Sequence, residues 1–147
     1  METYTSRVVM EQAGYRRERL PNGVLILRLM DARKETIEAW YEDCSRLMAG
    51  WRPERRLRYL HDIRRAELVT PHATERVTRI LRRMRTLPVT DARGAILLHS
   101  ETLAALLGSF LRRRSELGWD IRFFSDEGRA IRWLSESPWA DDSYMPD

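Results

Sequence analysis

Polar side chains that could bind a ligand or take part in a reaction lie where four predicted strands end. In an open α/β sheet, ligands gather outside the carboxyl ends of the parallel strands. Histidine, carboxylate and hydroxyl groups at such an edge are able to hold an anionic or polar head group through hydrogen bonds. The residues that the pattern brings to this edge are Asp31, His61, Asp62, His99, Ser100, Ser125 and Asp126.

Helix capping explains part of this polar edge without any ligand. Asp31, Ser100 and Asp126 each precede a predicted helix, and Asp and Ser are among the preferred N-cap residues. His61, Asp62 and His99 are less well explained by capping, although residues at strand ends also bond to nearby backbone. The polar residues at the strand ends are therefore open to two interpretations: they line a ligand cleft, or they cap the helices that follow.

The edge exists only if strands and helices alternate along the chain. Alternation from residue 24 onward predicts parallel pairing with right-handed crossovers. Two short strands at 7–11 and 15–20, followed by a turn at 21–23, would add antiparallel pairing. We therefore predict an α/β fold with a mixed, mostly parallel sheet of about five to six strands and about four helices. The parallel strands are expected at 24–30, 57–63, 94–98 and 121–124.

Four helices are expected between and after these strands. The first spans 33–50, with Asp31 as its cap and Gly50 as its end. The second runs to residue 87 from Thr70, a good cap that is followed by proline. Ser100 is expected to cap the third, and Ser125 and Asp126 precede the fourth, which ends near residue 134. We expect one domain over 1–134 and a loosely held acidic tail over 135–147.

The second predicted helix is rich in arginine. It carries five arginines between residues 76 and 85, in a chain of net charge +4. Three of them, Arg76, Arg79 and Arg83, are secondary candidates for anion binding. The arginines spread around the polar arc and no aromatic residue interleaves with them, so a solvated surface is favoured over a nucleic-acid interface.

Composition and motifs argue against catalysis, metal binding and a membrane span. The single cysteine, Cys44, falls on an apolar helix stripe, and the three histidines lack metal-ligand spacing. No nucleophile elbow, phosphate-binding loop or dinucleotide fingerprint occurs. No apolar run approaches the ~20 residues needed to cross a bilayer. We expect no enzyme activity, no cofactor and a cytoplasmic location.

The segments VLILRLM, LHDIRRAEL, GAILLH and IRFFSDEGRAIRWL follow one another in an order that resembles SpoIIAA-like proteins of the STAS superfamily. The resemblance implies a non-catalytic regulatory domain that acts by binding a partner protein or a second copy of itself. It also leaves room for a small anionic or lipid-like ligand. The antagonist branch of the superfamily carries a D-S-S-G phosphoacceptor motif, whose positions fall here on Thr70, Pro71, His72 and Ala73. Both serines are absent, so the chain resembles a divergent branch.

The two binding modes predict different contact residues. For a protein partner, the resemblance points to the start of the second helix, with Asp62, Thr70 and His72 as contacts. For a small ligand, a cleft would be lined by His61, Asp62, His99, Ser100 and Asp126. A protein interface should expose a flat apolar patch near the second helix, whereas a ligand site should contain a cavity.

Overall fold

The computed structural model describes residues 5–66, 70–111 and 119–136. Almost all of the tail expected at 135–147 lies outside these ranges. The strands are β1 (Arg7–Gln12), β2 (Tyr15–Arg19), β3 (Leu25–Leu29), β4 (Leu57–Asp62), β5 (Ala92–Leu97) and β6 (Trp119–Phe124). The helices are α1 (Lys34–Ala49), α2 (Pro71–Thr86), α3 (Glu101–Leu111) and α4 (Glu127–Ser135).

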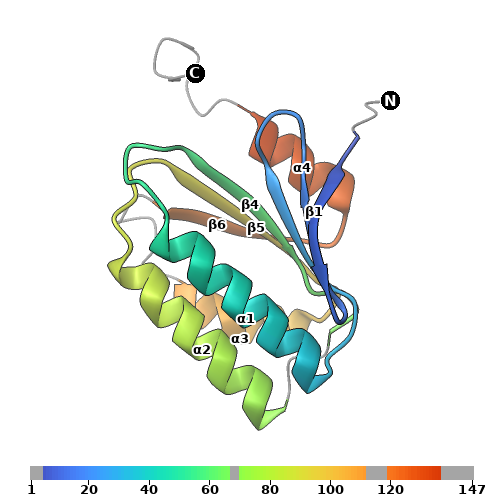
Figure 1. Cartoon of the computed structure of the whole chain (residues 1–147). Helices are drawn as coiled ribbons and strands as arrows, with labels where there is room; N and C mark the ends of the chain where they lie inside the picture. Colours follow the sequence, from blue (N-terminus) through green and yellow to red (C-terminus); the bar gives the residue numbers. More distant parts are fainter. Residues whose placement is uncertain (1–4, 67–69, 112–118, 137–147) are drawn as a thin grey trace.

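The strands form one mixed sheet in the order of the sequence, from β1 to β6 (Figure 1). Pairing is antiparallel between β1 and β2 and between β2 and β3, and it is parallel from β3 to β6. The turn between β2 and β3 places Gly23 at a φ of +92°, a conformation that glycine adopts without steric cost. The predicted fold class is confirmed. The only notable shift is that β5 and β6 begin two residues earlier than predicted.

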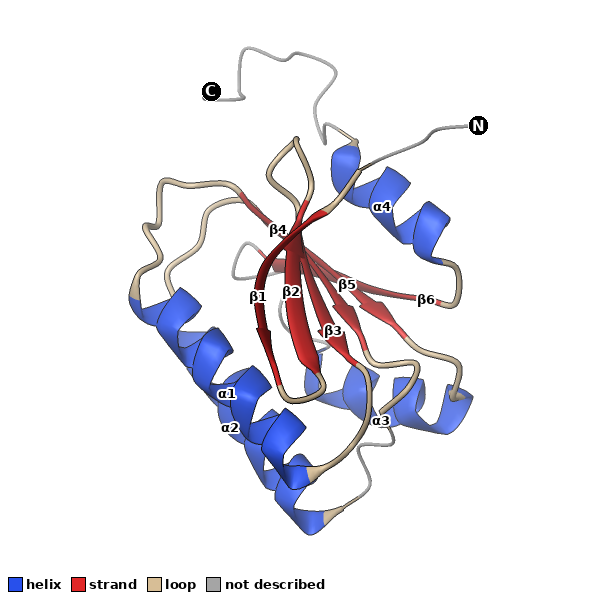
Figure 2. Cartoon of the chain, turned by 45° about the vertical axis from the view of Figure 1, so that its right-hand side comes forward, coloured by secondary structure: helices blue, strands red, loops and turns tan. Residues whose placement is uncertain are grey.

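The helices cover the two faces of the sheet unequally. Figure 2 shows α1, α2 and α3 on one side and α4 on the other. Each crossover from β3 to β6 moves to the next strand in the same direction, so a constant handedness puts the connecting helices on one face. The last helix follows the final strand and packs against β4, β5 and β6 from the opposite side.

Side chains alternate along each strand and so divide the core in two. Leu27, Leu29 and Tyr59 belong to the cluster beneath α1 and α2, which we call the α1–α2 face. Ile26 and Leu60 belong to the cluster beneath α4, which we call the α4 face.

Three of the four predicted caps are present. The side-chain oxygens of Thr70, Ser100 and Asp126 accept hydrogen bonds from the backbone N–H groups of Ala73, Leu103 and Gly128, each at 3.1 Å.

The predicted cap of α1 is wrong. The helix begins at Lys34 with Arg33 at the N-cap position and no side-chain cap there. Asp31 lies two residues before the N-cap position, and its carboxylate accepts a hydrogen bond of 3.0 Å from the Arg33 N–H instead. It therefore closes the turn that leads into the helix.

Gly94 allows the Tyr59 ring to lie across the backbone of β5. The two residues are paired in the ladder, and a Cβ on Gly94 would overlap the Tyr59 ring. We predict that Gly94→Ala lowers the free energy of unfolding by about 1–3 kcal/mol, the usual range for overpacking. Urea unfolding would measure the change.

Gly108→Ala is the matched control. A Cβ there meets only Phe123, at an ordinary 3.9 Å, and alanine favours a helix interior by about 0.5–1 kcal/mol. Equal losses in the two variants would contradict the close packing of Tyr59 on Gly94.

Candidate functional site

The predicted polar edge is divided between the two faces of the sheet. His61 and Asp62 are neighbours in β4, so their side chains point in opposite directions. His61 lies beneath α1, with its ring centroid 5.8 Å from that of Trp40 and 5.1 Å from that of Tyr59. Asp62 is buried on the α4 face and bonds to arginines there.

The remaining candidates do not join His61 or Asp62. His99 and Ser100 are exposed where β5 leads into α3, and Asp126 is exposed at the start of α4. Thr70 is occupied in capping α2. The Nε2 atom of His72 lies 2.9 Å from Glu38 Oε1, which links α2 to α1. Among the described residues, these side chains do not line a common cleft.

The arginine candidates on α2 have acidic or aromatic neighbours. Arg76 Nε lies 2.8 Å from Glu38 Oε1, and its guanidinium lies over the Tyr41 ring. Arg79 pairs with Glu75 one turn earlier on the same helix. Arg83 is exposed. The contacts of Arg76 and Arg79 satisfy much of their charge within the protein.

Asp62 belongs to a charged group on the α4 face that sequence analysis missed. Arg28 is 12% exposed and contacts three carboxylates from three elements. Its guanidinium lies 2.6 Å from Glu18, 2.8 Å from Asp62 and 2.5 Å from Glu127. Arg64 also contacts Asp62 and Glu127. We call Glu18, Arg28, Asp62, Arg64 and Glu127 the Arg28 cluster. A lone arginine within the apolar segment VLILRLM was the signal for it.

The arginines keep the carboxylates of this cluster ionised. Burial alone would raise the pKa of Glu18, but hydrogen bonds from Arg28 and Ser6 lower it below its usual value. Burial opposes ionisation of Asp62 as well, and hydrogen bonds from Arg64 and Arg28 again lower its pKa. Since each charge has an opposite partner, the cluster attaches the first turn of α4 to β2, β3 and β4.

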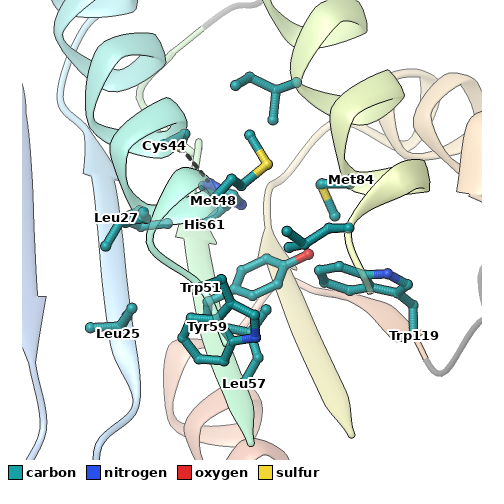
Figure 3. A pocket seen from close by; sticks show the side chains of 13 residues that line it. Leu25, Leu27, Cys44, Met48, Trp51, Leu57, Tyr59, His61, Met84 and Trp119 are labelled. Atoms are coloured by element: carbon teal, nitrogen blue, oxygen red, sulfur yellow. Dashed lines mark hydrogen bonds between the residues drawn. The ribbon is translucent and has the colours of Figure 1, made fainter. Parts of the chain in front are cut away.

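The α1–α2 face contains two adjoining cavities of about 60 Å³ and about 50 Å³. Both are lined almost entirely by apolar side chains, and they share Tyr59, His61, Ile80 and Met84. The other residues around the larger cavity are Leu25, Leu27, Cys44, Leu47, Met48, Trp51, Leu57, Leu87 and Trp119 (Figure 3). The smaller one is completed by Leu29, Trp40, Ile63, Val77, Leu81, Ile96 and Ile121.

Few polar groups reach these cavities. Burial lowers the pKa of His61 to about 4, so the imidazole is neutral at pH 7. Its Nε2 atom lies 3.9 Å from Cys44 Sγ. Burial raises the pKa of the Cys44 thiol, which therefore stays protonated and unreactive. In the described part of the chain, no three His, Cys, Asp or Glu side chains gather as a metal site requires.

Three indole nitrogens around the cavities have unmet hydrogen-bonding capacity. The Nε1 atoms of Trp40, Trp51 and Trp119 are buried and have no partner within the described ranges. The sequence pattern placed a possible ligand cleft at the polar edge of the sheet and did not indicate these cavities. The concentration of Trp and Met on the elements facing β4 was the available signal, because methionine fills irregular gaps in cores.

The comparisons with known proteins support the fold. No protein-family model matches the sequence, and no curated protein matches it either. A similar solved structure is an uncharacterized protein from the DUF3478 family, with a SpoIIAA-like fold, from Shewanella loihica PV-4. The two chains are 16% identical with a TM-score of 0.56, over 91% of this chain and 97% of that one. The fold is therefore SpoIIAA-like, as the sequence resemblance predicted.

The helices described in the structure include none that is long and apolar enough to cross a membrane.

Removing Arg28 tests whether the Arg28 cluster fixes α4 to the sheet. Arg28→Met leaves Glu18, Asp62 and Glu127 without their shared partner, and we predict a loss of about 3–5 kcal/mol in unfolding free energy. Arg28→Lys keeps the charge without the forked geometry and should lose less. Arg79→Met is the control, because its exposed pair with Glu75 is worth only about 0.3–0.5 kcal/mol.

The same variants predict a pH dependence. The folded pKa values of Glu18 and Asp62 lie below the unfolded ones. Their contribution to stability is thus fully present above the unfolded pKa of about 4 and is lost as the pH falls through the folded pKa. Urea unfolding at pH 7 and pH 3 should show a smaller acid-induced loss in Arg28→Met than in the wild type. An equal loss in both would contradict this account.

Proposed function

We propose that this SpoIIAA-like domain is a non-catalytic binding module for a small apolar, lipid-like molecule held between α1, α2 and the sheet. The observation that carries the proposal is the pair of apolar cavities that meet at Tyr59, His61, Ile80 and Met84. A site lined by apolar and aromatic side chains with few polar groups is typical of small-molecule pockets.

Neither cavity alone is large enough for a ring, and only a joined and slightly enlarged space would receive one ring or the end of an acyl chain. Apolar cavities stay dry, and one of about 150 Å³ binds benzene. The cavities of about 60 Å³ and about 50 Å³ have four lining side chains in common. One of these is Met84, whose unbranched thioether adapts easily to a new neighbour. A modest movement of Met84 would merge the two spaces.

Other interpretations have less support among the described residues. The large hydrophobic side chains that are exposed, Val8 and Val9, lie on β1 and do not form an apolar patch on α2. Asp62, a predicted partner contact, is buried in the Arg28 cluster. Nucleic-acid binding through α2 has less support, because two of the three candidate arginines, Arg76 and Arg79, are paired with acids.

The absence of catalysis is part of the same proposal. A nucleophile needs an adjacent base or a lowered pKa. Within the described chain, the cavity brings His61 near Cys44, whose pKa is raised by burial. A protonated thiol beside a neutral imidazole is a poor nucleophile, so this site favours ligand binding over catalysis.

A small aromatic probe tests the proposal. We predict that ethylbenzene shifts the backbone amide NMR signals of Tyr59, Ile80 and Met84 in a saturable way. Ile80→Phe would fill the space where the two cavities meet, so it should abolish the shifts. Circular dichroism would verify that the variant is folded.

The control is Val9→Phe, which adds similar bulk at a side chain that is 45% exposed on β1. It should bind ethylbenzene like the wild type. Shifts that persist in Ile80→Phe, or that appear only around β1, would refute the cavity as the binding site.

A further inference from the structure

We infer that the larger cavity on the α1–α2 face is a site for copper(I), a soft monovalent cation, with Cys44, Met48 and His61 as its ligands. The observation that carries the inference is that these three side chains line one cavity. Thiolate and thioether ligands select copper(I), and imidazole suits copper as well. The inference goes beyond the proposed function and does not depend on it, because an apolar molecule needs none of these donors.

The helix α1 presents Cys44 and Met48 together. The two residues are four positions apart in the helix, so their side chains are neighbours on one of its faces. That face packs on the sheet, because Cys44 is buried and both residues line the cavity. Figure 3 shows both side chains at the end of the cavity where His61 lies. One helix and one strand, β4, thus bring a thiol, a thioether and an imidazole to the same space.

The distance between Cys44 and His61 suits two ligands of one ion. His61 Nε2 lies 3.9 Å from Cys44 Sγ, the contact that Figure 3 draws as a dashed line. Bonds of about 2.0 Å to imidazole and about 2.3 Å to thiolate, as in zinc sites, put the two ligand atoms about 3.5 Å apart at a tetrahedral angle and about 4.3 Å apart when collinear. Copper(I) forms bonds of similar length. The observed separation lies within this span, so an ion fits between the two atoms without a backbone movement.

The rings around His61 fix the direction of its imidazole. The Trp40 and Tyr59 rings both meet it edge to face, with centroids 5.8 Å and 5.1 Å away. Burial lowers the pKa of His61 to about 4, so the imidazole is neutral at pH 7. Neutral imidazole is the form that binds metals. With its proton on Nδ1, the ring offers the Nε2 lone pair toward Cys44.

The lining of the cavity selects the charge of the ion. Among the described residues that line it there is no Asp, Glu, Lys or Arg, so the Cys44 thiolate is the one anionic ligand available. Burial raises the pKa of this thiol, because an isolated anion is unfavourable among apolar side chains. When copper(I) binds, the S–H bond breaks, an S–Cu bond forms and the proton leaves to water. The product has no net charge, so the penalty that raises the pKa is removed.

Zinc(II) has no equivalent fit. With one thiolate it would leave a net positive charge in an apolar space, which is unfavourable without a partner. Structural zinc also takes four ligands from Cys, His, Asp and Glu. In the part of the chain that the structure describes, not even three such side chains gather. A soft ion of low coordination number is therefore the better match.

Titration of the full chain with copper(I) in the absence of oxygen tests the inference. With bicinchoninate as the competing chelator, we expect one copper(I) ion to bind and one proton to be released. The sequence contains a single cysteine, so the ultraviolet absorption of a copper(I)–thiolate bond reports on Cys44 alone. X-ray absorption should show sulfur and an imidazole nitrogen around the ion. Zinc(II), titrated separately, should leave the NMR signals of Cys44 and His61 unmoved.

Conservative variants identify the ligands. Cys44→Ser removes the thiolate and should weaken copper(I) binding at least about a hundredfold, because even the outer partners of metal ligands contribute about 10–100-fold. Met48→Leu keeps the apolar bulk and removes the thioether, so it should weaken binding about tenfold. Met84→Leu is the matched control, because Met84 lines the same cavity from α2, and it should bind copper(I) like the wild type. Circular dichroism would verify that each variant is folded.

Four results would overturn the inference. They are a wild-type chain that does not bind copper(I), binding that survives unchanged in Cys44→Ser, an X-ray absorption spectrum without an imidazole nitrogen, and zinc(II) binding at Cys44 and His61. Binding that depends on Met84 and not on Met48 would overturn the assignment of the thioether ligand. The proposed function is tested separately, because ethylbenzene binds without a thiol and its titration contains no copper.

Discussion

Adjacent residues of a β-strand face opposite sides of the sheet, and in this protein both sides are covered by helices. This constraint separates His61 from Asp62, although they are neighbours in the sequence. Tyr59 and His61 are directed beneath α1 and α2, among apolar and aromatic side chains. Arg58, Leu60 and Asp62 are directed toward the α4 face, and Asp62 meets Arg28 there. One strand thus supplies a neutral cavity on one side and a charged contact on the other.

The two faces have different physical roles. On the α4 face, Arg28 joins carboxylates from β2, β4 and α4, so that helix is attached at a defined place on the sheet. Removing one partner from a buried ionic group leaves uncompensated charge, which makes this attachment specific. On the α1–α2 face, packing is apolar and incomplete, and dispersion contacts are lost around each void. A charged side that attaches α4 and an incompletely packed apolar side are compatible with the small-molecule binding that we propose.

The sequence predicted the fold well because its signals are local. Apolar runs marked β3 to β6, and Thr70 and Asp126 capped helices as their types predict. Asp31 failed as a cap by position, because the N-cap position of α1 is Arg33, two residues further along the chain. The candidate site was harder to predict, since the polar edge was inferred from strand ends without the alternation of faces. The Arg28 cluster joins residues 18, 28, 62, 64 and 127, and cavities depend on where side chains fail to meet. The residue pattern within a single strand or helix therefore determines neither the Arg28 cluster nor the cavities.

We propose that the space between α1, α2 and the sheet is an apolar cavity that admits small molecules. A crystal structure determined under xenon pressure tests it most directly, because xenon enters apolar cavities without forming hydrogen bonds. We expect a xenon atom in contact with Tyr59, Ile80 and Met84, which line both cavities. Closely packed side chains at that position with no xenon, or xenon bound only beneath α4, would contradict it.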